Sequence, residues 1–397
     1  MKRTVLAAMI PALLVAGAAN AAVIYDQNNN KLDLYGKIAG EYHFVSNHNA
    51  GMYDRGDASY VRLGLNGTTQ INDHLQGFGQ VEYNLAPNED NNFNGPNQMR
   101  LAFAGLKDDR YGSISYGRNW GVSYDVTGFT DMLPEWGEDT QGYMPEATNN
   151  YSGSAPTMFG NGRSDGVLQY RNSWDGFNLA LQLLAPNDSY DGDSSNHSYS
   201  RLIENGTGYG IAMTYDAGMG VTLGATYNNA QKSDWQKQNL ANDKNAQLWS
   251  VGAKYDANNI YAAINYTQTK NQMAYSMNPL GVDANGNSIN IGDTADSRDN
   301  NAFASTSQAV FAVAQYNFDN GLTPSIGYAQ GWLRHPNGYV GNQDYSKYVD
   351  LALTYNFNAN MNAYVDYKIN LLDNNEYTAN NALYTNNVAA VGLQYTF

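Results

Sequence analysis

Charged side chains set among alternating apolar residues are the first candidates for function in this sequence. Arg62 stands between Val61 and Leu63, and Lys37 and Arg100 stand in the same way among apolar neighbours. Side chains of a strand point alternately to two faces, so each cation lies on the face opposite its apolar neighbours. Fixed charges on a wet face can guide ions and polar solutes, but they break no bonds.

Residues that could perform bond chemistry are scarce. The chain has 5 His and no Cys, and no GxSxG motif supplies a nucleophile for a Ser-His hydrolase. Gly281 to Gly286 has the spacing of a phosphate-binding loop, but Asn287 stands where that motif needs Lys. Acidic groups such as Asp191 and Asp193 fit solvated Asx-turn loops better than a Ca²⁺ site. We therefore expect no enzyme, no cofactor and no metal site.

The beginning of the chain predicts export. Lys2 and Arg3 precede an apolar run, and Ala19-Asn20-Ala21 is a small-x-small cleavage site. We assign residues 1–21 to a signal peptide and residues 22–397 to one mature domain. With 22 Lys plus Arg against 37 Asp plus Glu, the formal charge is −15, which argues against nucleic acid as a partner.

The mature chain has the period of strands throughout. Residues 361–370 place Ala363, Val365 and Tyr367 on one face and Tyr364, Asp366 and Lys368 on the other. No apolar run after residue 22 is long enough for a membrane helix. The expected strands are 31–46, 58–70, 75–86, 98–107, 112–118, 166–173, 177–186, 207–215, 219–230, 247–255, 260–270, 306–317, 322–333, 346–357, 361–370 and 387–397.

The connections between these segments alternate between short and long. Short ones include 256–259 and 358–360, whereas 119–165 and 271–305 are long. Tyr residues directly precede several short turns, as in an interfacial aromatic girdle; these are Tyr215, Tyr255, Tyr316 and Tyr355. This rhythm predicts an all-β fold, a transmembrane antiparallel β-barrel of sixteen strands with short periplasmic turns and long extracellular loops. An apolar row ending in Phe397 completes the last strand.

Several longer motifs resemble the trimeric general porins of enteric outer membranes, the OmpF/OmpC type. They are Leu34-Tyr35-Gly36-Lys37, Arg62-Leu63-Gly64, Arg100 to Lys107, Tyr116-Gly117-Arg118-Asn119, Thr130 to Glu135, Tyr170-Arg171-Asn172, Lys254 to Tyr261 and Tyr364-Val365-Asp366-Tyr367. The resemblance extends from the signal peptide to Phe397.

That resemblance implies a Gram-negative outer-membrane homotrimer and a passive, weakly cation-selective pore for ions and small hydrophilic solutes. Lipopolysaccharide, outer-membrane lipid, periplasmic chaperones and the barrel-assembly machinery are the further partners it implies, and Phe397 resembles the assembly signal.

By the same resemblance, the third external loop folds into the lumen and narrows it. Loop carboxylates would then face basic side chains of the wall, and this constriction would consist of Asp131, Glu135, Lys37, Arg62, Arg100 and Arg163. Independently of the resemblance, Glu41, Glu82 and Asp366 have the parity of the lumen face. Possible further lumen residues are Glu82, Tyr124 and Arg171. Glu89 and Arg118 are possible trimer contacts.

The third loop, about 119–165, is longer than the resemblance leads us to expect. Its additional length must lie in the lumen, over the mouth or toward a neighbour. A solute-specific channel, for example for saccharides, is therefore the alternative function. A recognition role for the external loops, as in an adhesin, is a third and could coexist with a pore.

Overall fold

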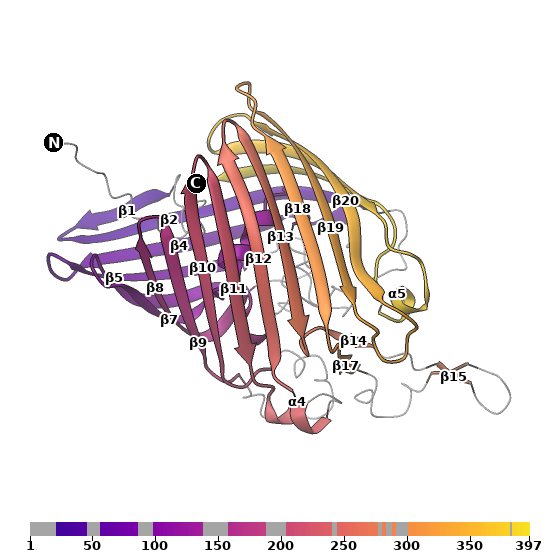
Figure 1. Cartoon of the computed structure of the whole chain (residues 1–397). Coiled ribbons are helices and arrows are strands. Elements are labelled where there is room, and N and C mark those ends of the chain that lie inside the picture. Colours follow the sequence, from indigo (N-terminus) through magenta and orange to yellow (C-terminus); the bar gives the residue numbers. More distant parts are fainter. Residues whose placement is uncertain are drawn as a thin grey trace.

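We analysed a computed structural model of the chain, which describes residues 21–45, 56–85, 98–137, 158–187, 204–239, 244–276, 280–282, 288–290, 301–381 and 383–397. Sixteen long antiparallel strands form one closed barrel (Figure 1). They are β2 (Asn30–Val45), β4 (Tyr60–Gln70), β5 (Leu75–Leu85), β6 (Gln98–Asp108), β7 (Gly112–Trp120), β8 (Arg163–Trp174), β9 (Phe177–Leu184), β10 (Gly208–Gly218), β11 (Val221–Ala230), β12 (Ala246–Ala257), β13 (Ile260–Lys270), β18 (Ser307–Tyr316), β19 (Leu322–Leu333), β20 (Gln343–Asn356), β21 (Met361–Asn370) and β22 (Val388–Thr396).

Each of these strands pairs with the next one along the chain, and the last strand returns to the first. β22 pairs with β2 from Lys37↔Thr396 to Val45↔Val388. Beyond that register, Phe397 N–H donates to Gly36 O at 3.0 Å and Gly36 N–H donates to Phe397 O at 2.8 Å. The closure removes the open edges of the sheet, and the prediction of sixteen strands is confirmed.

Smaller elements were not predicted. β1 (Ala22–Gln27) forms a hairpin with the start of β2 through Asn28 and Asn29, whose φ angles of 54° and 61° suit a tight primed turn. The others are β3 (Gly56–Asp57), β14 (Ala274–Ser276) paired with β17 (Asn301–Phe303), β15 (Leu280–Val282) paired with β16 (Ser288–Asn290), and the short helices α2 (Tyr124–Thr127), η1 (Gly128–Thr130), η2 (Met158–Gly160), α4 (Asp234–Asn239) and α5 (Glu376–Asn380).

The two ends of the barrel differ, as the connection lengths predict. One end carries tight turns such as Asn258-Asn259, with φ of 55° and 62°. The other end carries the longer connections, including α4, α5 and the β14–β17 hairpin (Figure 1). No helix in the described part of the chain is both long and apolar enough to cross a membrane.

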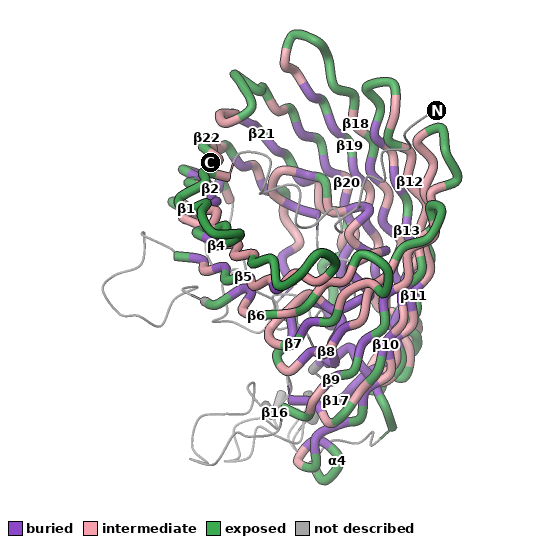
Figure 2. Tube along the Cα trace, turned by 90° about the vertical axis from the view of Figure 1, so that its left-hand side faces the viewer, coloured by how far each residue is buried: buried purple, intermediate pink, exposed green. Residues whose placement is uncertain are grey.

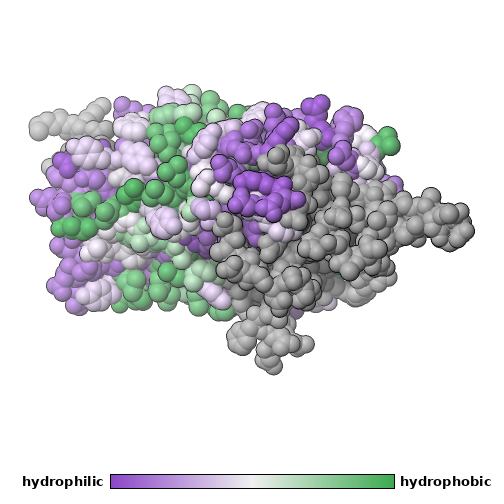
Figure 3. All heavy atoms as spheres, turned by 90° about the horizontal axis from the view of Figure 1, so that it is seen from below, coloured by the Kyte–Doolittle hydropathy of each residue, from purple (hydrophilic) through white to green (hydrophobic). Residues whose placement is uncertain are grey.

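The two faces of the wall have the polarity of a transmembrane pore. Leu351, Leu353 and Val365 point outward and are 42–51% exposed, whereas Asp350 and Asp366 point inward and are 0% and 2% exposed. Figure 2 shows this alternation of burial along the strands, and Figure 3 shows hydrophobic residues gathered in a band on the visible wall. The polar residues of each strand face the lumen, because a charged side chain facing lipid at the middle of the membrane costs about 2–4 kcal/mol.

Candidate functional site

The third external loop enters the barrel directly after β7. Its α2 and η1 pack against the inner faces of β10 to β13. Two inward glycines make room for this contact: a Cβ at Gly224 would lie 2.9 Å from Val126, and one at Gly252 would lie 3.2 Å from Phe129. The expectation that this loop folds into the lumen is confirmed for residues 121–137 and 158–162, while 138–157 lie outside the described residues.

Polar side chains of the wall hold the loop backbone. Asn265 Nδ2 donates to Thr127 O at 3.1 Å, and Gln315 Nε2 donates to Met132 O at 2.7 Å. Further along, Glu135 N–H donates to Asp366 Oδ2 at 3.2 Å. Buried backbone groups need such partners, so these contacts fix the path of the loop around the wall. Strand parity predicts that Asn265 and Asp366 face inward, but it does not predict these contacts, because each contact joins segments far apart in the chain.

Asp131 and the start of the loop form the first polar group inside the barrel. The Tyr124 hydroxyl donates to Asp131 Oδ2, and the Tyr124 ring stacks on Trp120 with centroids 3.8 Å apart. Nearby, Arg171 Nη1 lies 2.6 Å from Asp125 Oδ2. The structure therefore places the predicted lumen residues Tyr124 and Arg171 inside the wall, beside the base of the loop.

Glu135 lies against a different part of the wall, between β21 and β2. Its Oε1 is 2.8 Å from His43 Nε2, and its Oε2 is 2.8 Å from the Tyr364 hydroxyl. The same hydroxyl is 2.8 Å from Glu41 Oε2. Sequence reasoning assigned Glu41 to the lumen by parity, but it missed His43, which lies two residues further along the same face.

Three of the four predicted basic residues lie close together on β2, β4 and β6. Lys37 pairs directly with Arg62 across the strands, and both cations lie over the Tyr60 ring, at 4.9 and 5.3 Å from its centroid. Arg100 Nε is 2.6 Å from Glu82 Oε1, and Arg62 Nε is 4.0 Å from the same oxygen. Glu82 is thus an inward carboxylate held by two guanidinium groups.

Arg163, the fourth predicted basic residue, stands apart from this group. It opens β8, pairs with Trp120 and places its guanidinium 5.1 Å from that ring. β7 separates it from Arg100 on β6, and two strand spacings amount to about 10 Å. Arg163 is only 4% exposed, so it faces the base of the loop more than open lumen.

The residues predicted at subunit contacts lie on the outside of the wall or outside the described residues. Arg118 shares parity with the outward Ile114 and Tyr116, and its Nη1 is 2.9 Å from Asp165 Oδ2. Glu89 lies in the undescribed range 86–97.

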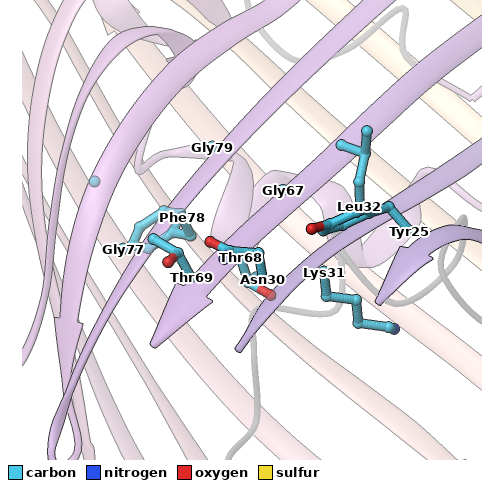
Figure 4. Close-up of a pocket in the computed structure, with 11 residues that line it drawn as sticks. Tyr25, Asn30, Lys31, Leu32, Gly67, Thr68, Thr69, Gly77, Phe78 and Gly79 are labelled. Atoms are coloured by element: carbon cyan, nitrogen blue, oxygen red, sulfur yellow. The ribbon is translucent and has the colours of Figure 1, made fainter. Parts of the chain in front are cut away.

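A hollow of about 430 Å³ occurs elsewhere, where β1 and β2 meet β4 to β6 (Figure 4). Tyr25, Lys31, Gly67 and Phe78 are among its lining residues, and none of the predicted constriction residues lines it. It is separate from the charged groups around the third loop.

A sixteen-stranded barrel with an apolar outer face, a charged lumen and an inserted third loop defines an outer-membrane porin. The sequence model of the Gram-negative porin family matches residues 27–397, and the chain belongs to that family. It is 45% identical to outer membrane protein F of Serratia marcescens and 42% identical to outer membrane porin N of Escherichia coli K12, over 100% of each chain.

A solved structure agrees with these relatives. The OmpF of Salmonella typhi, in complex with daunomycin, matches 95% of this chain and 100% of its own, with 36% identity and a TM-score of 0.76. The predicted outer-membrane location is confirmed, and the relatives support the general porin over the solute-specific alternative.

Proposed function

We propose that this barrel is a general diffusion channel, through which ions and small hydrophilic solutes cross passively and cations are weakly favoured. The observation that carries the proposal is the third loop inside the barrel, which brings Asp131 and Glu135 into a lumen whose wall bears Lys37, Arg62 and Arg100. We assign these five residues to the constriction, with Arg163 at its base.

Opposed charges on a narrow water path create a transverse field. Two unit charges about 4 Å apart interact by about 1 kcal/mol in water and about 4 kcal/mol at an effective dielectric of 20. Energies of this size bias the path of an ion without trapping it, as conduction requires. Apolar solutes lose hydration and gain little from such a field, so hydrophilic ones pass best.

The further partners belong to the same proposal. We infer a homotrimer, with outward Arg118 near the subunit contact and Glu89 as its possible counterpart. Phe397, whose backbone closes the barrel against Gly36, would be the signal read by the barrel-assembly machinery after periplasmic chaperones deliver the chain. Lipopolysaccharide and outer-membrane lipid would surround the apolar band.

A planar bilayer tests the proposal. Under a KCl gradient with EDTA present, we expect large openings that close in steps of three and a mildly cation-favouring reversal potential. Replacing Asp131→Asn and Glu135→Gln together should move the reversal potential toward anions, because it removes both loop charges and keeps the side-chain sizes. An unchanged reversal potential in the double variant would contradict the assignment.

A further inference from the structure

Glu41 and His43, which the function above does not use, form a cluster with Glu135 of the constriction. Glu41 and His43 are two residues apart on β2 and so share its inner face, where they are 8% and 9% exposed. Glu135 comes from the third loop. One ligand atom from each of the three residues lies within 4.8 Å of the other two.

Two carboxylates and one imidazole meet in this cluster. Among the described residues, the ion-pair partner of Glu135 is His43, and no Lys or Arg forms an ion pair with Glu41 or Glu135. A third carboxylate, Asp366, is 2% exposed, accepts the Glu135 N–H and shares a side-chain hydrogen bond with the Asp350 carboxyl group. Buried carboxylates in this number require a cation or protons.

The Tyr364 hydroxyl contacts both glutamates of the cluster. Its oxygen lies 2.8 Å from Glu41 Oε2 and 2.8 Å from Glu135 Oε2, but the hydroxyl has one proton to donate. Two carboxylate oxygens therefore meet one hydroxyl, and only one of these contacts is a hydrogen bond from Tyr364. A cation bound between the two carboxylates would remove the repulsion between Glu41 and Glu135.

We propose that Glu41, His43 and Glu135 bind a divalent transition-metal ion of the zinc class. One imidazole nitrogen and two carboxylate oxygens suit such ions, whereas Mg²⁺ and Ca²⁺ prefer all-oxygen sites. Ligands of a tetrahedral zinc ion lie about 3.4 Å apart for bonds near 2.1 Å. The observed 2.8 Å between His43 Nε2 and Glu135 Oε1 has to open, and the flexible Glu side chains allow that shift.

The surrounding residues orient the three ligands. Tyr364 reaches Glu41 by crossing Gly392, which pairs with Glu41 on one side and with Tyr364 on the other. Asp366 holds the backbone of Glu135, and the Trp136 ring lies 6.1 Å from the His43 ring. Metal sites depend on such outer contacts. The bound ion would tie the loop to the wall and cancel part of the negative charge of the lumen.

Isothermal titration of the EDTA-treated, intact protein with ZnCl₂ tests the site without relying on conduction. We expect one Zn²⁺ per chain, with affinity lowered at least about tenfold by His43→Gln. The matched control is His74→Gln, because His74 also pairs with a carboxylate, Asp109 at 3.0 Å, but lies at a turn with an exposed side chain. Equal affinity in wild type and His43→Gln, no Zn²⁺ binding by wild type, or Mg²⁺ binding as tight as Zn²⁺ would overturn the proposal.

Two further measurements keep the result interpretable. Conductance in EDTA shows whether each variant forms a channel, so loss of Zn²⁺ binding is separated from failure of the proposed function. If His43→Gln does not assemble, Glu41→Gln takes its place, since an amide oxygen can still accept from Tyr364. The visible spectrum of bound Co²⁺ should show histidine coordination in wild type, and an aqueous-ion spectrum at saturation would contradict the site.

Discussion

Two inward glutamates of the barrel wall, Glu82 and Glu41, each accept a hydrogen bond from a tyrosine in the same backbone arrangement. Their neighbours differ in charge: arginines surround Glu82, whereas a second carboxylate lies beside Glu41. In each case a tyrosine two strands away crosses a glycine on the intervening strand. Tyr35 crosses Gly64 to reach Glu82 at 3.0 Å, and Tyr364 crosses Gly392 to reach Glu41 at 2.8 Å.

The surroundings of the two carboxylates differ completely. Glu82 meets Arg100 at 2.6 Å and Arg62 at 4.0 Å, so its charge is neutralised inside the wall. Glu41 meets a second carboxylate, Glu135, through a shared hydroxyl, with His43 alongside. The same Tyr–Gly–Glu arrangement thus occurs once beside two arginines and once beside a second carboxylate. The backbone therefore sets the position of each glutamate, and the neighbouring side chains set its electrostatic environment.

The largest difference between the two sites should appear on removing one negative charge from each. Glu82→Gln leaves Arg100 buried without its carboxylate, and we expect a loss of about 3 kcal/mol, since breaking buried pairs typically costs 3–5 kcal/mol and lumen water still reaches Arg62. Glu41→Gln relieves repulsion and should leave stability unchanged or raise it. The denaturation temperature of the detergent-solubilised protein measures both. Equal destabilisation by the two variants would contradict the comparison.

The shared arrangement can be tested at its glycines. A Cβ at Gly64 would lie 2.1 Å from Tyr35, and one at Gly392 would lie 2.2 Å from Tyr364, so either Ala substitution must displace the tyrosine. We expect each to cost about 1–3 kcal/mol.

Gly40→Ala is the matched control, because the nearest atom to its added Cβ would be 4.0 Å away. The same thermal measurement, made on all three variants, should leave Gly40→Ala close to wild type. If Gly64→Ala and Gly392→Ala also left the denaturation temperature unchanged, the positions of Tyr35 and Tyr364 would not depend on glycine at these sites.

A buried lysine outside the pore should make stability depend on pH. Lys232, in the loop after β11, is 0% exposed, and its Nζ lies 3.0 Å from the Phe303 ring centroid. Burial lowers the pKa of Lys232 well below its ordinary value, which is about 10.4. Between the folded and ordinary pKa values the unfolded chain binds more protons, so stability should rise with pH by at most about 1.4 kcal/mol per pH unit.

Lys232→Met should abolish that pH dependence. We expect the denaturation temperature of wild type to rise relative to the variant between pH 7 and pH 10. Parallel curves for the two proteins would show that Lys232 has an ordinary pKa in the folded loop.

The sequence predicted what depends on local alternation. Parity alone placed Arg62, Arg100, Glu41, Glu82 and Asp366 on the inner face, and the turn rhythm located all sixteen strands. Local alternation did not predict the contacts between the third loop and the wall. Glu135 is separated from His43 by 92 residues and from Tyr364 by 229, and only the docked loop brings them together. Arg163 has the expected position in the chain, but it begins β8, two strands from Arg100, and its guanidinium lies over the Trp120 ring.

Reversal potentials of two single variants test the account most directly. Wild type, Glu135→Gln and Arg62→Gln should be compared in one KCl gradient with EDTA present. The account predicts opposite displacements, toward anions for Glu135→Gln and toward cations for Arg62→Gln, because each removes one sign of charge from the lumen. Displacements of the same sign, or none in either variant, would contradict a pore governed by these opposed charges.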